Sequence, residues 1–188
     1  METTISNKQV ETIIRTIIQP ALIEKKLHRV FLIGFMGTGK TTFGKKLAQY
    51  LDYTFIDTDL YIENTYHTTI NQLFIEKGET GFRTIEKKIL EELSAIEHVV
   101  IATGGGTPCF YNNMETINTT GLSIYLQTPT EELTKRLIAG KMKRPLLKDK
   151  TAEEISDFIN EVLPQRAAFY EQADLSLEVF EKTKNREK

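Results

Sequence analysis

A glycine-rich segment near the start of the chain constrains the fold more than any other feature. Residues Gly34–Thr41, with the sequence GFMGTGKT, fit the pattern G-x-x-x-x-G-K-S/T. The apolar run Val30–Ile33 directly precedes the segment and is typical of a buried strand. The residues after it are apolar at helical spacing, namely Phe43, Leu47, Ala48 and Leu51. The order of strand, glycine loop and helix favours a phosphate-binding loop over an ordinary glycine turn.

The chemistry of this segment indicates a nucleoside triphosphate. Glycines allow successive backbone N–H groups to surround phosphate oxygens, and the following helix adds its positive N-terminal end. In this pattern Lys40 reaches the β- and γ-phosphates, and Thr41 offers a hydroxyl to Mg²⁺. GTPases, ATPase motors and small-molecule kinases all share such a loop, so further features are needed to choose among them.

The composition limits the class of protein. At 188 residues the chain is about one domain long and can bury a core without disulfides. Its formal net charge of −2 gives no broad basic surface for nucleic acid or an anionic membrane, and no apolar run approaches the length of a membrane span. The single cysteine, Cys109, cannot form an internal disulfide and is expected to be a small buried side chain. We expect a cytoplasmic protein that binds neither nucleic acid nor membrane.

Short apolar runs alternate with helical patterns, which predicts an α/β fold with a five-stranded parallel sheet. The expected strands are Val30–Ile33, Thr54–Ile56, Val99–Ala102, Ser123–Leu126 and Leu175–Val179. Capping boxes at Thr128–Glu131 and Thr151–Glu154 mark two helix starts, and Gly140 is expected to close the first of these helices. A further helix has an expected buried face formed by Phe82, Ile85, Ile89, Leu93 and Ile96.

The ends of the chain differ from the rest. A helical apolar stripe within residues 1–28 is expected to end at Pro20; its members are Val10, Ile13, Ile14, Ile17 and Ile18. The stretch lacks the basic start and continuous apolar core of a secretory signal. We expect an amphipathic extension packed on the main domain or on a partner chain, with a weakly ordered extension or an unused upstream start codon as alternatives. Residues 29–180 form the expected main domain, and residues 181–188 a flexible tail.

Two carboxylates follow the second expected strand. Asp57 and Asp59 lie where ligands bind in open parallel sheets, beyond the carboxyl ends of the strands. If the chain stays extended here, the two side chains share a face while Thr58 points away. One carboxylate is then available to a metal and the other to an acceptor hydroxyl. A polar strand end without chemistry is the alternative.

Two further segments carry ligand chemistry. Within Gly81–Glu86, Arg83 and Glu86 are three residues apart on a helix, so the carboxylate can hold the guanidinium toward an anion. A plain surface ion pair is the alternative. The segment Thr103–Thr107 contains three consecutive glycines directly after an apolar strand. Glycines there allow a ligand to approach the backbone, and a merely flexible turn would carry a large entropic cost.

A basic, poorly periodic stretch, Gly140–Lys150, lies between two capped helices. In a phosphate-transfer enzyme such a loop acts as a mobile lid that excludes water and brings cations to the transferred group. A solvated connector is the alternative.

In this order, the motifs make the chain resemble the shikimate kinase family from about Arg29 to Val179. They are the phosphate-binding loop, Asp57-x-Asp59, Gly81-Phe82-Arg83, Thr103–Gly106, Arg144–Leu147, and Arg166 followed by Tyr170. The resemblance implies a three-layer P-loop kinase fold with helices on both faces of the sheet and a mobile lid. The family often has proline after the second arginine, where this chain has Ala167-Ala168-Phe169. That change removes a backbone constraint but no charged partner.

The resemblance also implies a nucleotide site for ATP and Mg²⁺. The residues expected at the ATP phosphates are Gly37, Thr38, Gly39, Lys40, Thr41 and Thr42. Thr41 is expected on Mg²⁺, with Asp57 near the metal through water. Arg136 is expected at the adenine face, and Arg144 is expected to move in with the lid to neutralise the transferring phosphoryl group. Lys40, Asp59 and Arg144 are the expected catalytic residues.

For the acceptor, the resemblance implies that Asp59 takes or orients the shikimate hydroxyl. Arg83 and Arg166 are expected to hold the shikimate carboxylate, with Glu86 holding Arg83 in place. The backbone N–H groups expected to help are those of Gly104, Gly105 and Gly106.

The expected activity is ATP-dependent phosphorylation of the 3-hydroxyl of shikimate to shikimate 3-phosphate, in the pathway to chorismate and the aromatic amino acids, by a monomer. Three alternatives stay open: a gluconate or nucleoside monophosphate kinase, a nucleotide-binding regulatory module, and a structural or interaction protein. A regulatory module needs neither Asp59 nor Arg144, and a related kinase needs no arginine pair beside the glycines.

Overall fold

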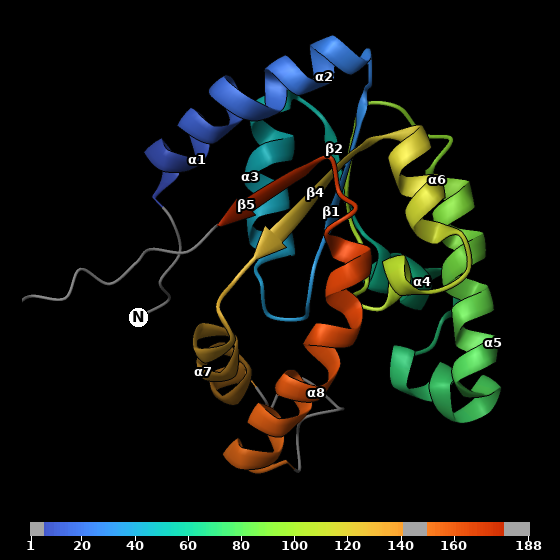
Figure 1. Cartoon of the computed structure of the whole chain (residues 1–188). Coiled ribbons are helices and arrows are strands. Elements are labelled where there is room, and N and C mark those ends of the chain that lie inside the picture. Colours follow the sequence, from blue (N-terminus) through green and yellow to red (C-terminus); the bar gives the residue numbers. More distant parts are fainter. Residues whose placement is uncertain (1–5, 141–149, 179–188) are drawn as a thin grey trace, which may run out of the picture.

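A single parallel sheet organises the molecule (Figure 1). The computed structural model describes residues 6–140 and 150–178. In this part of the chain the strand order is β2-β3-β1-β4-β5, with every neighbouring pair parallel. The strands are β1 (Arg29–Ile33), β2 (Thr54–Asp57), β3 (Val99–Ala102), β4 (Leu122–Gln127) and β5 (Leu175–Glu178). The predicted α/β class and all five strands are confirmed, although Val179 lies outside the described residues.

Helices cover both faces of the sheet (Figure 1). The α-helices are α1 (Asn7–Ile13), α2 (Gln19–Lys25), α3 (Lys40–Leu51), α4 (Thr58–Tyr66), α5 (Ile70–Leu93), α6 (Asn113–Thr120), α7 (Thr130–Gly140) and α8 (Ala152–Tyr170). A π-helical turn, Ile14–Ile18, joins α1 to α2, and a 3₁₀ turn, Thr107–Cys109, precedes α6. None of the helices in these described ranges is long and apolar enough to cross a membrane.

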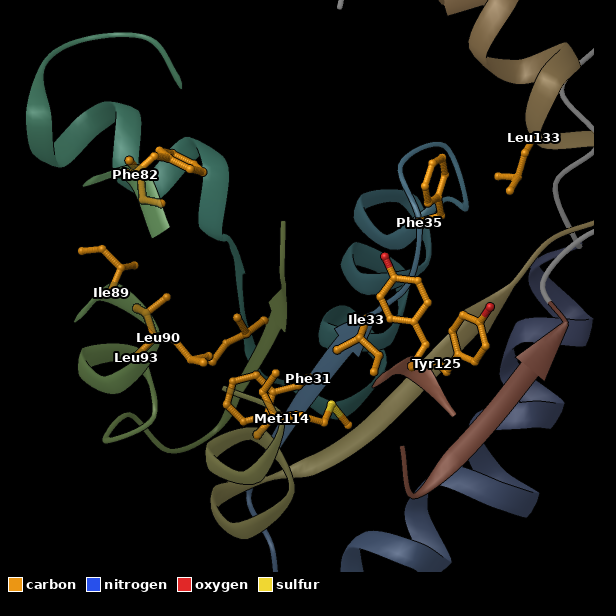
Figure 2. Packing of buried hydrophobic residues seen from close by; sticks show 14 of the residues in the cluster. Phe31, Ile33, Phe35, Phe82, Ile89, Leu90, Leu93, Met114, Tyr125 and Leu133 are labelled. Carbon is orange, nitrogen blue, oxygen red and sulfur yellow. The ribbon is translucent and has the colours of Figure 1, made fainter. Parts of the chain in front are cut away.

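Alternate residues of β1 face two different apolar clusters, because successive side chains of a strand point to opposite faces. Phe31 and Ile33 belong to the cluster that α5, α6, α7 and α8 cover. Val30 and Leu32 belong to the cluster beneath α3 and the N-terminal helices. Figure 2 shows Phe31 and Ile33 among side chains of the first cluster. Both faces of the sheet are therefore buried, which explains why its strands are continuous apolar runs.

The N-terminal helix does not end at Pro20, so that prediction was wrong. The helix continues through α2 to Lys25. In the π-helical turn the Gln19 N–H donates to the Ile14 carbonyl, and the wider turn leaves Pro20 in the first turn of α2. Proline is tolerated there because the first helical N–H groups need no intrahelical acceptor. The buried residues of the segment are Val10, Ile14, Ile18 and Leu22, whereas Ile17 is 38% exposed.

Of the two predicted capping boxes, one is present. The Thr151 hydroxyl accepts from the Glu154 N–H at 3.2 Å, and the Glu154 carboxylate accepts from the Thr151 N–H at 2.6 Å. The box at Thr128 was wrong. Helix α7 begins at Thr130, and the buried Thr128 hydroxyl has no hydrogen-bond partner among the described residues. Packing of this side chain into the interior replaces the cap.

Helix α5 contains a break, and its buried face differs from the predicted one at its C-terminal end. Its backbone leaves the helical region at Gly78, where φ is 64° and ψ is 179°. Ile96 lies beyond the helix end and is 39% exposed, whereas Leu90 is buried in the core. Arg83 and Glu86 lie in the second half of α5, beyond this break.

Candidate active site

Three segments meet at the carboxyl edge of the sheet because β1, β2 and β3 are neighbours. Leu32 pairs with Ala102, and Ala102 pairs with Asp57. The Thr103 N–H extends the sheet pattern by donating to the Leu32 carbonyl at 3.1 Å. The glycine loop after β1, the Asp57 and Asp59 carboxylates at the junction of β2 and α4, and the triple glycine after β3 therefore lie side by side.

The phosphate-binding loop has the expected strand, loop and helix order. Gly37 and Gly39 have φ values of 87° and 94°, which favour glycine, and α3 begins at Lys40. The Thr38 hydroxyl donates to the Phe35 carbonyl at 2.9 Å. The Lys40 ammonium donates to the carbonyls of Gly34 and Phe35 at 2.8 and 2.9 Å. These contacts place a cation and the start of a helix at one loop. Thr42 follows in the first turn of α3.

Asp57 links the glycine loop to α4. One carboxylate oxygen accepts from the Thr41 hydroxyl at 2.9 Å, and the other caps α4 by accepting from the N–H groups of Asp59 and Leu60 at 3.2 and 3.4 Å. The prediction of an extended chain here was wrong, since Asp59 lies in the first helical turn. Because Asp57 is the cap, α4 starts at Thr58, so neither Thr58 nor Asp59 continues the strand. Thr58 is buried, and its hydroxyl accepts from the Gly104 N–H at 2.9 Å.

Asp59 lies among other acids. Burial raises the pKa of its carboxyl to about 6, and the neighbouring Asp57 and Glu86 carboxylates raise it further while Lys40 opposes them. The residue nevertheless keeps solvent exposure, so water screens part of this effect. At neutral pH the carboxyl is mainly ionised, and its basicity is higher than that of an ordinary aspartate.

Arg83 and Glu86 form a buried pair, which excludes the plain surface ion pair. The two residues are 8% and 4% exposed, and an Arg83 guanidinium nitrogen lies 2.6 Å from a Glu86 carboxylate oxygen. Glu79 accepts a second bond from Arg83 at 3.0 Å, and the guanidinium lies 4.1 Å from the ring centroid of Phe110. The Arg83 Nε is buried without a hydrogen-bond partner in the described residues. The Thr107 hydroxyl donates to the other Glu86 oxygen at 2.6 Å.

The glycines after β3 allow these groups to approach one another. A Cβ atom at Gly104 would lie 2.9 Å from carboxylate oxygens of both Asp59 and Glu86, and one at Gly106 would lie 2.6 Å from an Arg83 nitrogen. Because real Cβ atoms do not tolerate such distances, a side chain at either position would displace the charged groups. The Gly104 N–H already donates to the Thr58 hydroxyl. The contribution of Gly104 is therefore the absence of a side chain, which lets the Asp59 and Glu86 carboxylates lie close to the backbone.

Gly105 connects the site to α8. A Cβ atom at Gly105 would lie 3.5 Å from an Arg166 nitrogen, and the Arg166 guanidinium lies 5.6 Å from the ring centroid of Phe35 in the glycine loop. Arg83 and Arg166, which are far apart in sequence, thus flank the same triple glycine. The carboxylates, the two arginines and the glycine loop form one site.

Of the two arginines expected at the nucleotide, only Arg136 lies within the described residues. Arg136 lies against the glycine loop, where its guanidinium donates to the Gly37 carbonyl at 3.4 Å and to Glu132 at 2.8 Å. Arg144 and most of the predicted lid lie outside the described residues.

Cys109 is partly buried, and burial raises the pKa of its thiol to about 11. The thiol is therefore protonated at neutral pH.

Sequence reasoning assigned no role to Thr58, Thr107 or Tyr170, although each contacts the site through a hydroxyl. Their positions could have indicated a role for two of them, because Thr58 lies between Asp57 and Asp59 and Thr107 ends the glycine segment. Within the described ranges, no cluster of three or more His, Cys, Asp or Glu side chains could hold a metal ion.

A family model and a curated relative indicate the same family. A family model described as Shikimate kinase matches residues 36–188. A curated shikimate kinase of Parabacteroides distasonis is 48% identical over 152 residues, which cover 81% of this chain and 88% of that protein.

Solved structures show the same likeness. The crystal structure of shikimate kinase from Bacteroides thetaiotaomicron has a TM-score of 0.80 and 46% identity, covering 84% of this chain and 89% of that one. The structure of shikimate kinase from Acinetobacter baumannii in complex with shikimate has a TM-score of 0.73 and 35% identity, covering 87% of this chain and 88% of that one.

Proposed function

This chain belongs to the shikimate kinase family, and we propose that the site at the carboxyl edge of its sheet transfers the γ-phosphoryl group of ATP to the 3-hydroxyl of shikimate. This is the ATP-dependent step that yields shikimate 3-phosphate on the way to chorismate. The observation that carries the proposal is the convergence of Asp59, Arg83 and Arg166 on one triple glycine beside the phosphate-binding loop. A carboxylate-bearing alcohol needs both a base and cations, and a phosphate loop alone supplies only the second.

On the nucleotide side, Gly37–Thr42 surround the ATP phosphates, and Lys40 exchanges its loop carbonyls for phosphate oxygens. The Thr41 hydroxyl and the Asp57 carboxylate, 2.9 Å apart, are oxygen donors that suit Mg²⁺. Mg²⁺ usually takes few protein ligands and completes its shell with phosphates and water, so the lack of a larger acidic cluster in the described residues fits this ion. When bound, it supplies charge neutralisation on the phosphates. Arg136 extends the loop's positive surface.

On the acceptor side, the shikimate hydroxyl oxygen attacks the γ-phosphorus as the bond to the β,γ-bridging oxygen breaks, and ADP leaves. Asp59 accepts the hydroxyl proton, for which its raised pKa of about 6 suits it. Arg83 and Arg166 bind the carboxylate of the acceptor, while Glu86 fixes Arg83. Positioning and charge neutralisation are what a loose phosphoryl-transfer transition state requires.

Arg144 completes the proposal from sequence alone. Its expected part is to neutralise the transferring group, so Arg144→Ala should lower kcat by about 10³–10⁵. A loss under tenfold would remove Arg144 from the mechanism.

The monomeric state, the cytoplasmic location and the absence of nucleic acid or membrane partners stay predictions. We also propose that the described part of the N-terminal extension, residues 6–28, is integral to the folded domain, because Ile14 and Ile18 are fully buried in it.

The test is ADP release with ATP and Mg²⁺, offering shikimate, gluconate and nucleoside monophosphates in parallel. Fast turnover with shikimate alone is expected. Arg166→Ala should raise the KM for shikimate roughly 10- to 100-fold, the scale of a charge-assisted hydrogen bond, without a similar change for ATP. Gln165→Ala, at an exposed neighbouring position on α8, is the matched control and should behave as wild type. Turnover with another acceptor, or ATP binding without any turnover, would refute the proposal.

A further inference from the structure

Tyr170, the last residue of α8, is buried completely yet makes a polar contact with the site. Its hydroxyl donates to the Gly105 carbonyl at 2.5 Å, across 65 residues of sequence. Burial raises the pKa of the Tyr170 hydroxyl above its ordinary value, so the group is a permanent donor at any working pH. The ring packs against Tyr125 of β4 with centroids 5.2 Å apart, which leaves the hydroxyl little freedom to move.

The position of Tyr170 on α8 connects this contact to the acceptor site. Arg166 precedes Tyr170 by four residues, so both side chains leave the same face of the helix. Both reach Gly105, since a Cβ atom there would lie 3.5 Å from Arg166 Nη1. The same Cβ atom would lie 3.4 Å from the Met36 backbone nitrogen in the phosphate-binding loop. Gly105 therefore lies close to both the nucleotide loop and the helix that carries Arg166 and Tyr170.

A run of three glycines has many accessible backbone conformations, and ordering it costs conformational entropy. The Tyr170 hydrogen bond selects one of these conformations before any ligand arrives. Other hydrogen bonds hold Gly104 and Gly106. Without the Tyr170 bond, the Gly105 carbonyl has no side-chain donor among the described residues, so the ligand must order Gly105 instead. That cost falls on the ligand that contacts the triple glycine and Arg166.

We propose that Tyr170 is a positioning residue for the acceptor: its hydroxyl holds Gly105 against α8 so that the triple glycine and Arg166 face the carboxylate of the acceptor together. The inference rests on the proposed function for the identity of that acceptor. It concerns binding of the acceptor and not the chemical step, because Tyr170 is completely buried and acts through Gly105.

Tyr170→Phe tests the proposal, because phenylalanine fills the same space and removes one oxygen. The expected result is a KM for shikimate about five- to tenfold higher, the ratio that corresponds to one net hydrogen bond, with kcat and the KM for ATP within twofold of wild type. Tyr125→Phe is the matched control. It removes a hydroxyl from a neighbouring ring, 8% exposed, that makes no hydrogen bond with the described part of the chain. This control should leave all three constants unchanged.

A purely structural role would give a different result. If Tyr170→Phe lowers the melting temperature but leaves the KM for shikimate unchanged, or raises both KM values equally, the positioning role is overturned. Amide hydrogen exchange in the loop 104–107, measured without any ligand, gives an independent readout. It should be faster in Tyr170→Phe than in wild type and Tyr125→Phe, and equal exchange would also overturn the proposal. Absence of shikimate turnover in wild type would instead refute the proposed function, which the exchange experiment does not depend on.

Discussion

Asp59→Asn should make the protein more stable while abolishing its activity. The folded environment raises the pKa of this carboxyl from 3.8 to about 6, so folding disfavours the ionised form. The difference of about 2 units corresponds to about 3 kcal/mol at a pH above 6. Two effects reduce that figure. Water reaches the exposed side chain and screens its charge, and an acid in the first turn of α4 gains about 0.3–1 kcal/mol from the helix N-terminus.

We therefore expect Asp59→Asn to raise the free energy of unfolding by about 1 kcal/mol at pH 7.5, which for a chain of this size raises Tm by about 2–4 °C. The sign depends on pH. Because the folded pKa is the higher one, the cost of the ionised form is complete above pH 6 and disappears as the pH falls from 6 toward 4. Thermal unfolding of both proteins at pH 7.5 and at pH 4.5 measures this, together with kcat at pH 7.5.

Asp157→Asn, at an exposed position on α8, is the control and should change Tm by less than about 1 °C. The reasoning fails if Asp59→Asn is no more stable than wild type at pH 7.5. It also fails if the gain is equally large at pH 4.5, because a gain independent of pH cannot come from an ionised carboxylate.

Three further outcomes are expected. The kcat/KM for shikimate should fall about tenfold per pH unit below pH 6, since protonated Asp59 cannot accept a proton; a profile flat down to pH 5 would contradict this. Ile18→Ala should cost about 2–5 kcal/mol in urea unfolding because the side chain is fully buried, whereas Ile17→Ala, at a position 38% exposed, should cost much less. Gly44→Ala should cost about 1–3 kcal/mol, since the new Cβ would lie 2.5 Å from the Phe55 ring; an unchanged urea midpoint would show that the ring moves aside freely.

Features that depend on a few neighbouring residues could be predicted from the sequence. The phosphate-binding loop is one, because strand, glycines and helix start are adjacent in the chain and their hydrogen bonds are local. The Thr151 capping box is another. The five strands were also predictable, since a sheet buried on both faces leaves continuous apolar runs.

Local patterns failed where burial or distant packing decides the outcome. Pro20 ends a regular α-helix, but a π-helical turn before it removes the conflict, and nothing near Pro20 in sequence announces that turn. Thr128 has the spacing of a cap, yet it is packed inside. Asp57 caps α4 so early that Asp59 is helical, which no extended pattern reveals.

The sequence by itself determined the fold class, the family and the residue types of the site. Only the tertiary structure decided that Arg83 and Glu86 are buried rather than on the surface, because Phe110 and Thr107 come from a loop far along the chain. It also decided that Tyr170 reaches Gly105. The physical reason is that spacing within a helix or strand is set by local backbone geometry, whereas burial and long-range hydrogen bonds exist only once the elements have packed together.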